Sequence, residues 1–415
     1  MSQLRPNHQV QLLQGGQAFF QALVQAIERS AHEVRIETYI FSVEASGEQV
    51  AVALERAAQR GVAVYLVMDG VGTPGIPLEW VTRFDAAGVK WHIFSPLGRL
   101  GVLIPNRWRR LHRKLCVVDG AVAFCGGINV LDDFYDPNHG ALEAPRFDFA
   151  VRVTGPLVQA VHEATVQFWW RLQATSTARH SDFPAAWRAL QEAVTLALQA
   201  RSDTDTDTDT DTDAGAQIPS ALDHHTNAAL VLRDNVRNRS RIERSYRKAI
   251  GAAHHEIIIA NAYFVPGGKL RKGLIHAAQR GVRVRLLLQG RYEYFMQYHA
   301  TRPVYGALLA AGVEIHEYAV SFLHAKVAVI DGHWATVGSS NLDPLSLLLA
   351  REANVVVDDV AFAQDLRARL EHAMAHGGVR VDPAAYANRP WRQRFLDRVA
   401  FGVMRILLFL NGKRY

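Results

Sequence analysis

The sequence predicts an α/β protein built from two duplicated α/β/α domains, with mixed, mostly parallel sheets and an active site between domains related by a pseudo-twofold axis. Three observations predict this class. The chain has 415 residues, of which 49% are hydrophobic, and this is enough for two cores. Short apolar runs rich in β-branched residues alternate with Ala-rich segments. A group of polar residues also occurs twice, and an offset of 212 positions relates His112 of the first copy to His324 of the second.

The first half of the chain and the second half contain the same succession of predicted elements. The pattern pairs strand 33–41 with 256–264, helix 47–60 with 268–280, and strand 62–68 with 282–289. A glycine follows each of these helices, as expected for a helix C-cap. A second helix then ends at Gly88 or Gly312, and another strand follows. Strands that alternate with helices predict a sheet covered on both faces.

A β-hairpin is predicted next in each half. Both copies consist of an apolar run, an Asp-Gly pair and a second apolar run, and Asp-Gly between such runs is a strong hairpin signal. The repeated polar residues are His112, Lys114, Asp119 and Asn129 in the first copy, and His324, Lys326, Asp331 and Asn341 in the second. Residues two apart on a strand point to the same face, so each histidine is expected beside its lysine.

These residue types in this pattern indicate chemistry on a phosphate group. Two imidazoles and two ammonium groups, brought together by the pseudo-twofold, suit covalent transfer of a phosphoryl-type group without a metal. Asn129 and Asn341 can donate amide N–H groups to phosphate oxygens. Asp119 and Asp331 are expected first of all to shape the turns, because aspartate tolerates the left-handed region, but a chemical role for them stays open.

No metal or other cofactor is expected. The sequence has 18 histidines but no His-Glu-x-x-His motif and no Cys/His cluster with zinc-like spacing. Its two cysteines, Cys116 and Cys125, correspond to Ala328 and Val337 in the second copy, so they are expected to be buried packing residues.

Residues 203–213 alternate strictly between Asp and Thr. Dense like charge without core-forming side chains predicts a solvated linker, with a calcium site as the alternative. The net charge of the chain is +6, and without the six aspartates of this segment the remainder carries +12. The folded part is therefore expected to attract anionic partners, either membrane headgroups or nucleic acid.

The C-terminal segment 391–410 is cationic and strongly apolar, but Arg405 interrupts its apolar residues. A membrane span needs about 20 apolar residues, so we expect a helix that lies in the membrane interface rather than across it. A terminal helix packed on the core, or a dimer contact, is the alternative. Residues 99–110 form a second basic and apolar stretch, which predicts either a lipid-facing rim beside the first hairpin or a solvated loop. The N-terminus has no apolar core typical of a secretory signal.

The repeated motif His-x-Lys-x4-Asp, followed by Gly-Gly or Gly-Ser and then Asn, resembles the signature of the phospholipase D superfamily. The similarity covers nearly the whole chain outside the Asp-Thr segment. More finely, the chain is similar to bacterial cardiolipin synthases, in particular the B-type form, which lacks the two N-terminal membrane spans of its longer relatives. The supporting segments, besides the first hairpin, are 36–41, Asp69-Gly70, Arg146-Phe-Asp148-Phe and the basic tail.

The resemblance implies a role for each site residue. By analogy His112 attacks phosphorus to form a phosphohistidine, and His324 protonates the departing glycerol oxygen, although the sequence alone cannot order the two. The resemblance also implies that the lysines and asparagines hold the nonbridging oxygens. Asp148 and Glu352, which each open an apolar strand, then accept from the far ring nitrogen of the histidines. For Asp148 a salt bridge to Arg146 or Arg152 is the alternative.

The resemblance further implies a peripheral phosphatidyltransferase on the cytoplasmic side of the bacterial inner membrane. It would make cardiolipin and glycerol from two phosphatidylglycerol molecules, and its partner is an anionic phospholipid membrane. A phospholipase D-type hydrolase or nuclease, and a non-catalytic lipid-binding protein, are the alternatives; nucleic acid is not the expected partner. Oligomeric state does not follow from the sequence. The expected units are an N-terminal domain (1–202), a linker (203–220), a C-terminal domain (221–385) and a membrane-association tail (386–415).

Overall fold

The protein is described here by a computed structural model of the whole chain. The structure describes residues 4–98, 108–179, 226–234, 238–291, 295–343 and 350–410. The Asp-Thr segment, most of the stretch 99–110 and the predicted boundaries between linker and domains lie outside the described residues.

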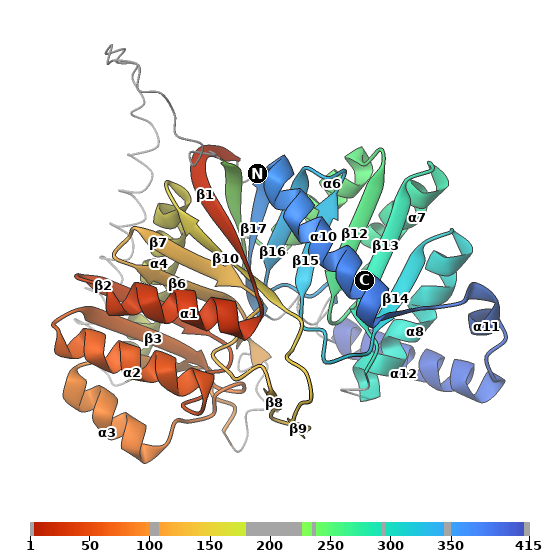
Figure 1. Cartoon of the computed structure of the whole chain (residues 1–415). Coiled ribbons are helices and arrows are strands. Elements are labelled where there is room, and N and C mark those ends of the chain that lie inside the picture. The colour runs from red at the N-terminus through yellow and green to blue at the C-terminus, as the bar shows by residue number, and fades with distance from the viewer. Residues whose placement is uncertain are drawn as a thin grey trace, which may run out of the picture.

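The first half of the chain forms one lobe, drawn on the left in Figure 1. Its strands are β1 (Arg5–Gln14), β2 (Glu33–Thr38), β3 (Ala63–Asp69), β4 (Lys90–Phe94), β5 (Arg110–Leu111), β6 (Lys114–Val118), β7 (Val122–Gly126), β8 (Tyr135–Asp136), β9 (Gly140–Ala141) and β10 (Phe149–Thr154). Its helices are α1 (Gly15–Glu28), α2 (Ser46–Gln59), α3 (Leu78–Ala87) and α4 (Leu157–Arg179). The predicted succession of strand, Ala-rich helix, strand, helix, strand and hairpin is confirmed.

The second half repeats this succession in the lobe on the right of Figure 1. Its strands are β11 (Thr226–Arg233), β12 (Glu256–Asn261), β13 (Arg283–Gln289), β14 (Glu314–Tyr318), β15 (Lys326–Ile330), β16 (Trp334–Gly338), β17 (Ala350–Asp358) and β18 (Gly378–Arg380). Its helices are α6 (Arg241–Ala252), α7 (Gly268–Gln279), α8 (Phe295–Ala310), α10 (Val360–Gly377), α11 (Pro383–Ala387) and α12 (Trp391–Leu410).

Apart from the short pair β8–β9, the strands of both lobes join into one mixed sheet with the order β18-β14-β13-β12-β15-β16-β17-β11-β1-β10-β7-β6-β2-β3-β4. The sequence predicted mixed sheets in two domains, but not that the two would join into one. Apart from β18, the order reads the same outward from the centre, where β11 of one lobe pairs with β1 of the other. In the described part of the chain, the long parallel pairings occur within β2-β3-β4 and β12-β13-β14, whose strands are joined by helices. The hairpins β6–β7 and β15–β16 are antiparallel because a tight turn joins their strands.

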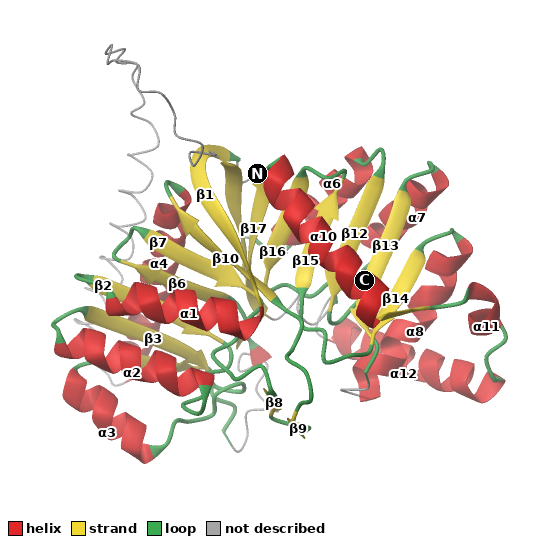
Figure 2. Cartoon of the chain, in the orientation of Figure 1, coloured by secondary structure: helices red, strands yellow, loops and turns green. Residues whose placement is uncertain are grey.

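Helices cover both faces of each half of the sheet, which gives each lobe three layers (Figure 2). The sheet of the first lobe and its helices α1, α2 and α3 enclose one apolar core, and the sheet of the second lobe with α6, α7 and α8 encloses another. A third core contains residues of both lobes, among them Val151 of β10 and Val355 of β17, and is closed by α4 and α10. The lobes are therefore joined by shared hydrophobic packing, which holds a site between them in place. Both cysteines are buried, as expected for packing residues.

The C-terminal helix α12 packs along α8 in the second lobe, below the sheet in Figure 1. His299 Nδ1 of α8 lies 2.8 Å from Asp397 Oδ1, and Arg389 donates to the other oxygen of the same carboxylate at 3.0 Å. Among the residues that the structure describes, no helix combines the length and the hydropathy that a bilayer crossing requires.

Candidate active site

The two repeated histidines line one cleft between the lobes, with a volume of about 660 Å³. Asn129, Asn341 and Asp148 line the same cleft, so the structure brings together residues that are far apart in the sequence. His112 and His324 each precede the first strand of a hairpin, and the lysine two positions later begins that strand. Because one hydrophobic core contains residues of both lobes, the two histidines hold fixed positions on the same cleft.

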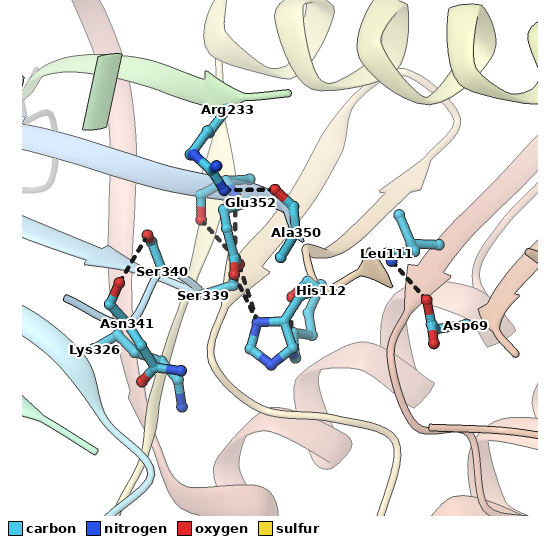
Figure 3. Close-up of polar contacts among 12 residues, drawn as sticks. Asp69, Leu111, His112, Arg233, Lys326, Ser339, Ser340, Asn341, Ala350 and Glu352 are labelled. Carbon is cyan, nitrogen blue, oxygen red and sulfur yellow. Dashed lines mark hydrogen bonds and ion pairs between the residues drawn. The ribbon is translucent and has the colours of Figure 1, made fainter. Parts of the chain in front are cut away.

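Each histidine is held by an acid from the opposite lobe. His112 Nδ1 lies 3.0 Å from a carboxylate oxygen of Glu352, and His324 Nδ1 lies 2.6 Å from Asp148 Oδ2. Figure 3 shows the first of these contacts. An ionised carboxylate only accepts hydrogen bonds, so Nδ1 carries the proton in both rings and Nε2 is the nitrogen left for chemistry. The sequence did not specify this crossed pairing.

The backbone of each histidine is held by the same two-residue segment that holds its ring. The carbonyl of Arg351, directly before Glu352, accepts from the N–H of His112 at 3.0 Å. The carbonyl of Phe147, directly before Asp148, accepts from the N–H of His324 at 2.9 Å. A backbone bond and a side-chain bond from one rigid segment leave the imidazole little freedom to turn.

The two acids have different surroundings, although their positions are related by the duplication. Ser339 Oγ donates to Glu352 Oε2 at 2.6 Å, and Ser339 Oγ also accepts from the N–H of Ala353 at 3.1 Å. The residue at the same place in the first copy is Gly127, where a Cβ atom would lie 2.3 Å from Asp148 Oδ1. A glycine is therefore required there by the close approach of the carboxylate. Asp148 instead accepts from the N–H of Phe149 at 2.8 Å.

The lysines lie beside the histidines, as predicted, but fold back toward the backbone. Lys114 Nζ donates to the carbonyl of His112 at 2.7 Å, and Lys326 Nζ donates to the carbonyl of His324. Both side chains are almost fully buried. Asn129 Oδ1 accepts from the N–H of Ile40 at 3.2 Å, so its amide nitrogen is the donor available to a ligand.

Burial and the nearby charges shift the pKa values of the cleft. Burial lowers the pKa of Lys114 to about 7, against the carboxylates of Glu352 and Asp148. Burial also lowers the pKa of His112, and it holds the pKa of His324 well below its ordinary value together with the positive charges of Lys326 and Lys114. The Asp148 carboxyl has its pKa raised by burial to about 6. Both imidazoles are therefore neutral near pH 7.

Asp119 and Asp331 occupy the hairpin turns, away from the cleft. Both have a positive φ, 52° and 51°, and the glycine that follows each also has a positive φ, as this tight turn requires. The Asp119 carboxylate accepts from the N–H groups of Ala31, His32 and Glu33, each at 2.8 Å. Asp331 accepts in the same way from residues 254–256. Of the two roles that the sequence left open for Asp119 and Asp331, these contacts favour the turn role over a chemical one.

Replacing Asp119 with Ala is expected to lower the free energy of unfolding by about 2 kcal/mol, because three backbone N–H groups lose their acceptor. The turnover rate per folded molecule should stay close to that of the wild type. Chemical denaturation followed by circular dichroism, together with turnover assays, checks both values. A large loss of turnover in a fully folded variant would contradict the turn role.

Several residues of the cleft were not assigned a role from the sequence. Tyr39 packs edge-on against His112, with ring centroids 5.1 Å apart, and Tyr263 of the other lobe lines the same cleft. Both follow a repeated strand, and this repetition was the signal that could have found them. Arg146 also lines the cleft and pairs with Asp136 at 3.3 Å, so the expected alternative of a salt bridge to Asp148 is not its contact here. Trp108 lines the cleft as well, at the end of the predicted rim.

The sequence matches a family model described as cardiolipin synthase, phospholipase D-like domain, over residues 23–142 and 246–374. Among curated relatives, cardiolipin synthase B of Escherichia coli (strain K12) is 36% identical over 410 residues, which cover 98% of this chain and 90% of the relative. Cardiolipin synthase A of Pseudomonas aeruginosa (strain LESB58) is 30% identical over 368 residues, 88% of this chain and 66% of the relative.

Solved structures share the fold. A phosphatidylserine synthase of Haemophilus influenzae superposes with a TM-score of 0.64 at 11% identity, covering 96% of this chain and 94% of the other. A polyphosphate kinase of Porphyromonas gingivalis superposes with a TM-score of 0.52 at 12% identity, covering 88% of this chain and 50% of the other. The two matched regions of the family model fall one in each lobe, and each contains one of the histidine hairpins. The chain therefore belongs to the cardiolipin synthase family of phospholipase D-like proteins.

Proposed function

We propose that this chain is a phosphatidyltransferase that makes cardiolipin and glycerol from two phosphatidylglycerol molecules through a covalent phosphohistidine. The observation that carries the proposal is the pair of histidines on one cleft, each with its Nδ1 held by an acid of the opposite lobe. Two reactive nitrogens on either side of one phosphorus are what a two-step displacement with an enzyme-bound intermediate needs. The names of the relatives support the lipid class.

In the first step, Nε2 of His112 attacks phosphorus and the bond from phosphorus to the headgroup glycerol oxygen breaks. His324 gives its Nε2 proton to that oxygen, so that neutral glycerol leaves and the phosphatidyl group stays on His112. Lys114, Lys326, Asn129 and Asn341 are the donors for the nonbridging oxygens as negative charge builds. His112 is assigned as nucleophile by analogy with the family.

Protonation of His324 is coupled to substrate binding in this scheme. Burial and the positive charges of Lys326 and Lys114 keep the pKa of His324 well below its ordinary value. An anionic phosphodiester in the cleft adds a negative charge beside the ring, which favours the protonated imidazole and raises the pKa. His324 therefore becomes a general acid only when the substrate, with its leaving group, is bound beside it.

In the second step, Nε2 of His324 takes the proton of a headgroup hydroxyl on a second phosphatidylglycerol. That oxygen attacks phosphorus, the bond from phosphorus to His112 breaks, and cardiolipin leaves with His112 neutral again. Water in place of the second lipid would give phosphatidic acid. Ile40, Val71 and Leu131 are among the residues that line the cleft, and apolar lining of this kind favours a lipid over water.

A direct test uses phosphatidylglycerol with a labelled headgroup in vesicles. Cardiolipin and free glycerol should form in equal amounts. Phosphatidic acid as the sole lipid product would make the chain a hydrolase, and an absence of turnover would leave a lipid-binding role. Nucleic acid added to the same preparation is expected to stay intact.

We further propose that one face of α12 binds the surface of an anionic membrane, on the cytoplasmic side of the bacterial inner membrane. The helix turns Asp397 and Ala400 toward the lobe, where both are buried. Among the side chains of this helix that the structure describes, up to residue 403, the exposed apolar ones are Trp391, Phe395, Leu396, Val399 and Val403. Arginines at 392, 394 and 398 stand along the same helix. Apolar side chains flanked by cations fit the interface of a bilayer with anionic headgroups.

Replacing both Trp391 and Phe395 with Ala is expected to weaken binding to phosphatidylglycerol vesicles at least about 10-fold, because burial of each ring in the interface contributes more than about 1 kcal/mol. The thermal midpoint should hardly change, since the side chains are 71% and 63% exposed. Vesicle co-sedimentation and thermal unfolding check these values. Leu78→Ala, at a position 79% exposed in α3, is the matched control. Unchanged vesicle binding in the double variant would refute the membrane role.

A further inference from the structure

Asp69 ends strand β3, is fully buried and contacts the backbone directly before His112. Its Oδ2 accepts from the N–H of Leu111 at 2.7 Å, as Figure 3 shows beside the His112 ring. Its Oδ1 accepts from the N–H of Val71 at 2.8 Å and from the guanidinium of Arg110 at 3.1 Å. The carboxylate thus ties the end of β3 to the two residues before the histidine.

The second lobe has the corresponding hydrogen bond, but its acceptor is a neutral amide instead of a carboxylate. Gln289 ends strand β13, the counterpart of β3, and its Oε1 accepts from the N–H of Leu323 at 3.3 Å. Leu323 directly precedes His324, as Leu111 precedes His112. The duplicated fold therefore places a side-chain acceptor under each catalytic histidine at the same strand end. The acceptor in the first lobe is a charged carboxylate, whose hydrogen bonds are shorter and stronger than those of a neutral amide.

Asp69 also acts on the cleft through its charge. The charged groups that act on the pKa of Lys114 are Glu352 of β17, Lys326 of β15, Asp148 before β10 and Asp69 of β3, and His112 and His324 lie within range of its charge as well. The three carboxylates favour the protonated amine, whereas burial and Lys326 oppose it. Removal of the Asp69 charge therefore moves the loss of the Lys114 proton to lower pH.

We propose that Asp69 is a positioning residue, which fixes His112 in its reacting orientation through the N–H of Leu111. The inference rests on the proposed function in one respect, that His112 is a reacting group at the phosphodiester. Together with Arg351 and Glu352, Asp69 completes a three-point support: one bond to the residue before the histidine, one to its backbone and one to its ring.

The test is Asp69→Asn, assayed with bis(p-nitrophenyl) phosphate and with phosphatidylglycerol. We expect kcat to fall roughly 10- to 100-fold while KM changes less than about 3-fold, because a misplaced reacting group costs turnover rather than binding. The alkaline limb of the pH profile should move to lower pH. Gln289→Ala, which removes the weaker bond of the other lobe, should lower kcat less.

Two further variants separate positioning from stability. Leu54→Ala, at a fully buried position of α2, destabilises the same lobe without touching the cleft, and its kcat should stay within about 2-fold of wild type. Asp69→Asn combined with Arg110→Gln removes the positive charge whose ion pair with Asp69 the single variant breaks. Arg110 also donates to the carbonyls of Trp108 and Ser95, so only part of any loss in thermal midpoint should be recovered. The acid-shifted pH limb should remain, since the charge beside Lys114 is still missing.

The outcomes distinguish this inference from the proposed function. If wild-type protein turns over neither substrate, the proposed function fails. If it turns over bis(p-nitrophenyl) phosphate and Asp69→Asn keeps both kcat and the pH profile, the positioning role is refuted while the proposed chemistry stands. A loss of kcat that is fully regained in the double variant, with a normal pH limb, would also refute it, since stability alone would then explain the effect.

Discussion

Replacing His324 with Ala is expected to stop cardiolipin formation, with a fall in kcat of at least about 10⁴-fold. With an activated donor lipid, the variant should still transfer the phosphatidyl group to His112 and then stop. The reason is that His324 acts in both steps, but its action in the first step is needed only when the leaving group requires a proton. It protonates the headgroup oxygen in the first step and deprotonates the incoming alcohol in the second. A p-nitrophenyl ester of phosphatidic acid needs no proton on its leaving group, so the variant can complete the first step alone.

The measurement is a single burst of p-nitrophenolate equal to the enzyme concentration, followed by mass spectrometry of the peptide that contains His112. His112→Ala should show neither a burst nor a modified peptide. Both ring positions are only partly exposed, so the thermal midpoint of each variant is recorded as the control for folding. A burst in His112→Ala with the adduct on His324 would reverse the order of the two histidines. Wild-type turnover of phosphatidylglycerol in either variant would refute the shared site.

Local patterns in the sequence were sufficient to predict the lobes and their hairpins. Asp-Gly between apolar runs predicted a tight turn, and Asp119 and Gly120 indeed have the positive φ values of such a turn. The alternation of apolar strands with Ala-rich helices predicted the order of elements because neighbouring residues determine it. The duplication predicted that His112 and His324 act together, since each copy carries half of the chemistry.

The contacts across the lobes could not be predicted in this way. The chain segment from Asn129 to Asp148 has more residues than the segment from Asn341 to Glu352, so the two acids do not share the common offset of the motifs. The spacing therefore does not predict which acid contacts which histidine. The pairing of acid and histidine depends on how the two lobes pack in the shared core. Such packing leaves no periodic pattern in the sequence of either lobe. Asp69 was visible as an Asp-Gly pair, but only the fold brings β3 beneath Leu111.

Changing Asp148 to Asn or Glu352 to Gln is expected to lower kcat roughly 10³-fold, although neither side chain is a candidate to touch phosphorus. An amide cannot stabilise the imidazolium as a carboxylate does, and it can favour the wrong ring tautomer. The two variants should differ in their pH dependence. Burial raises the pKa of Asp148 to about 6, so the carboxylate that holds His324 is lost as the pH falls through that value.

The free enzyme should therefore lose kcat/KM on both sides of a narrow range. On the acid side Asp148 gains a proton near pH 6, and on the alkaline side Lys114, whose pKa is lowered to about 7, loses one. In kcat, which reports the substrate complex, the alkaline limb should lie at higher pH because the bound phosphodiester favours charged Lys114. Asp148→Asn should remove the Asp148 part of the acid limb, whereas Glu352→Gln should keep it.

The crossed pairing itself is tested by proton NMR of the two ring Nδ1–H groups, whose short bonds to carboxylates give resonances far downfield. Glu352→Gln should shift the resonance of His112 and leave that of His324, and Asp148→Asn should do the reverse. The size-swapped variants Asp148→Glu and Glu352→Asp keep the charge but change the reach of the carboxylate, so they serve as matched controls with smaller losses of kcat. If each acid instead perturbed the histidine of its own lobe, the two halves would form separate sites, and a single phosphodiester could not be the shared substrate.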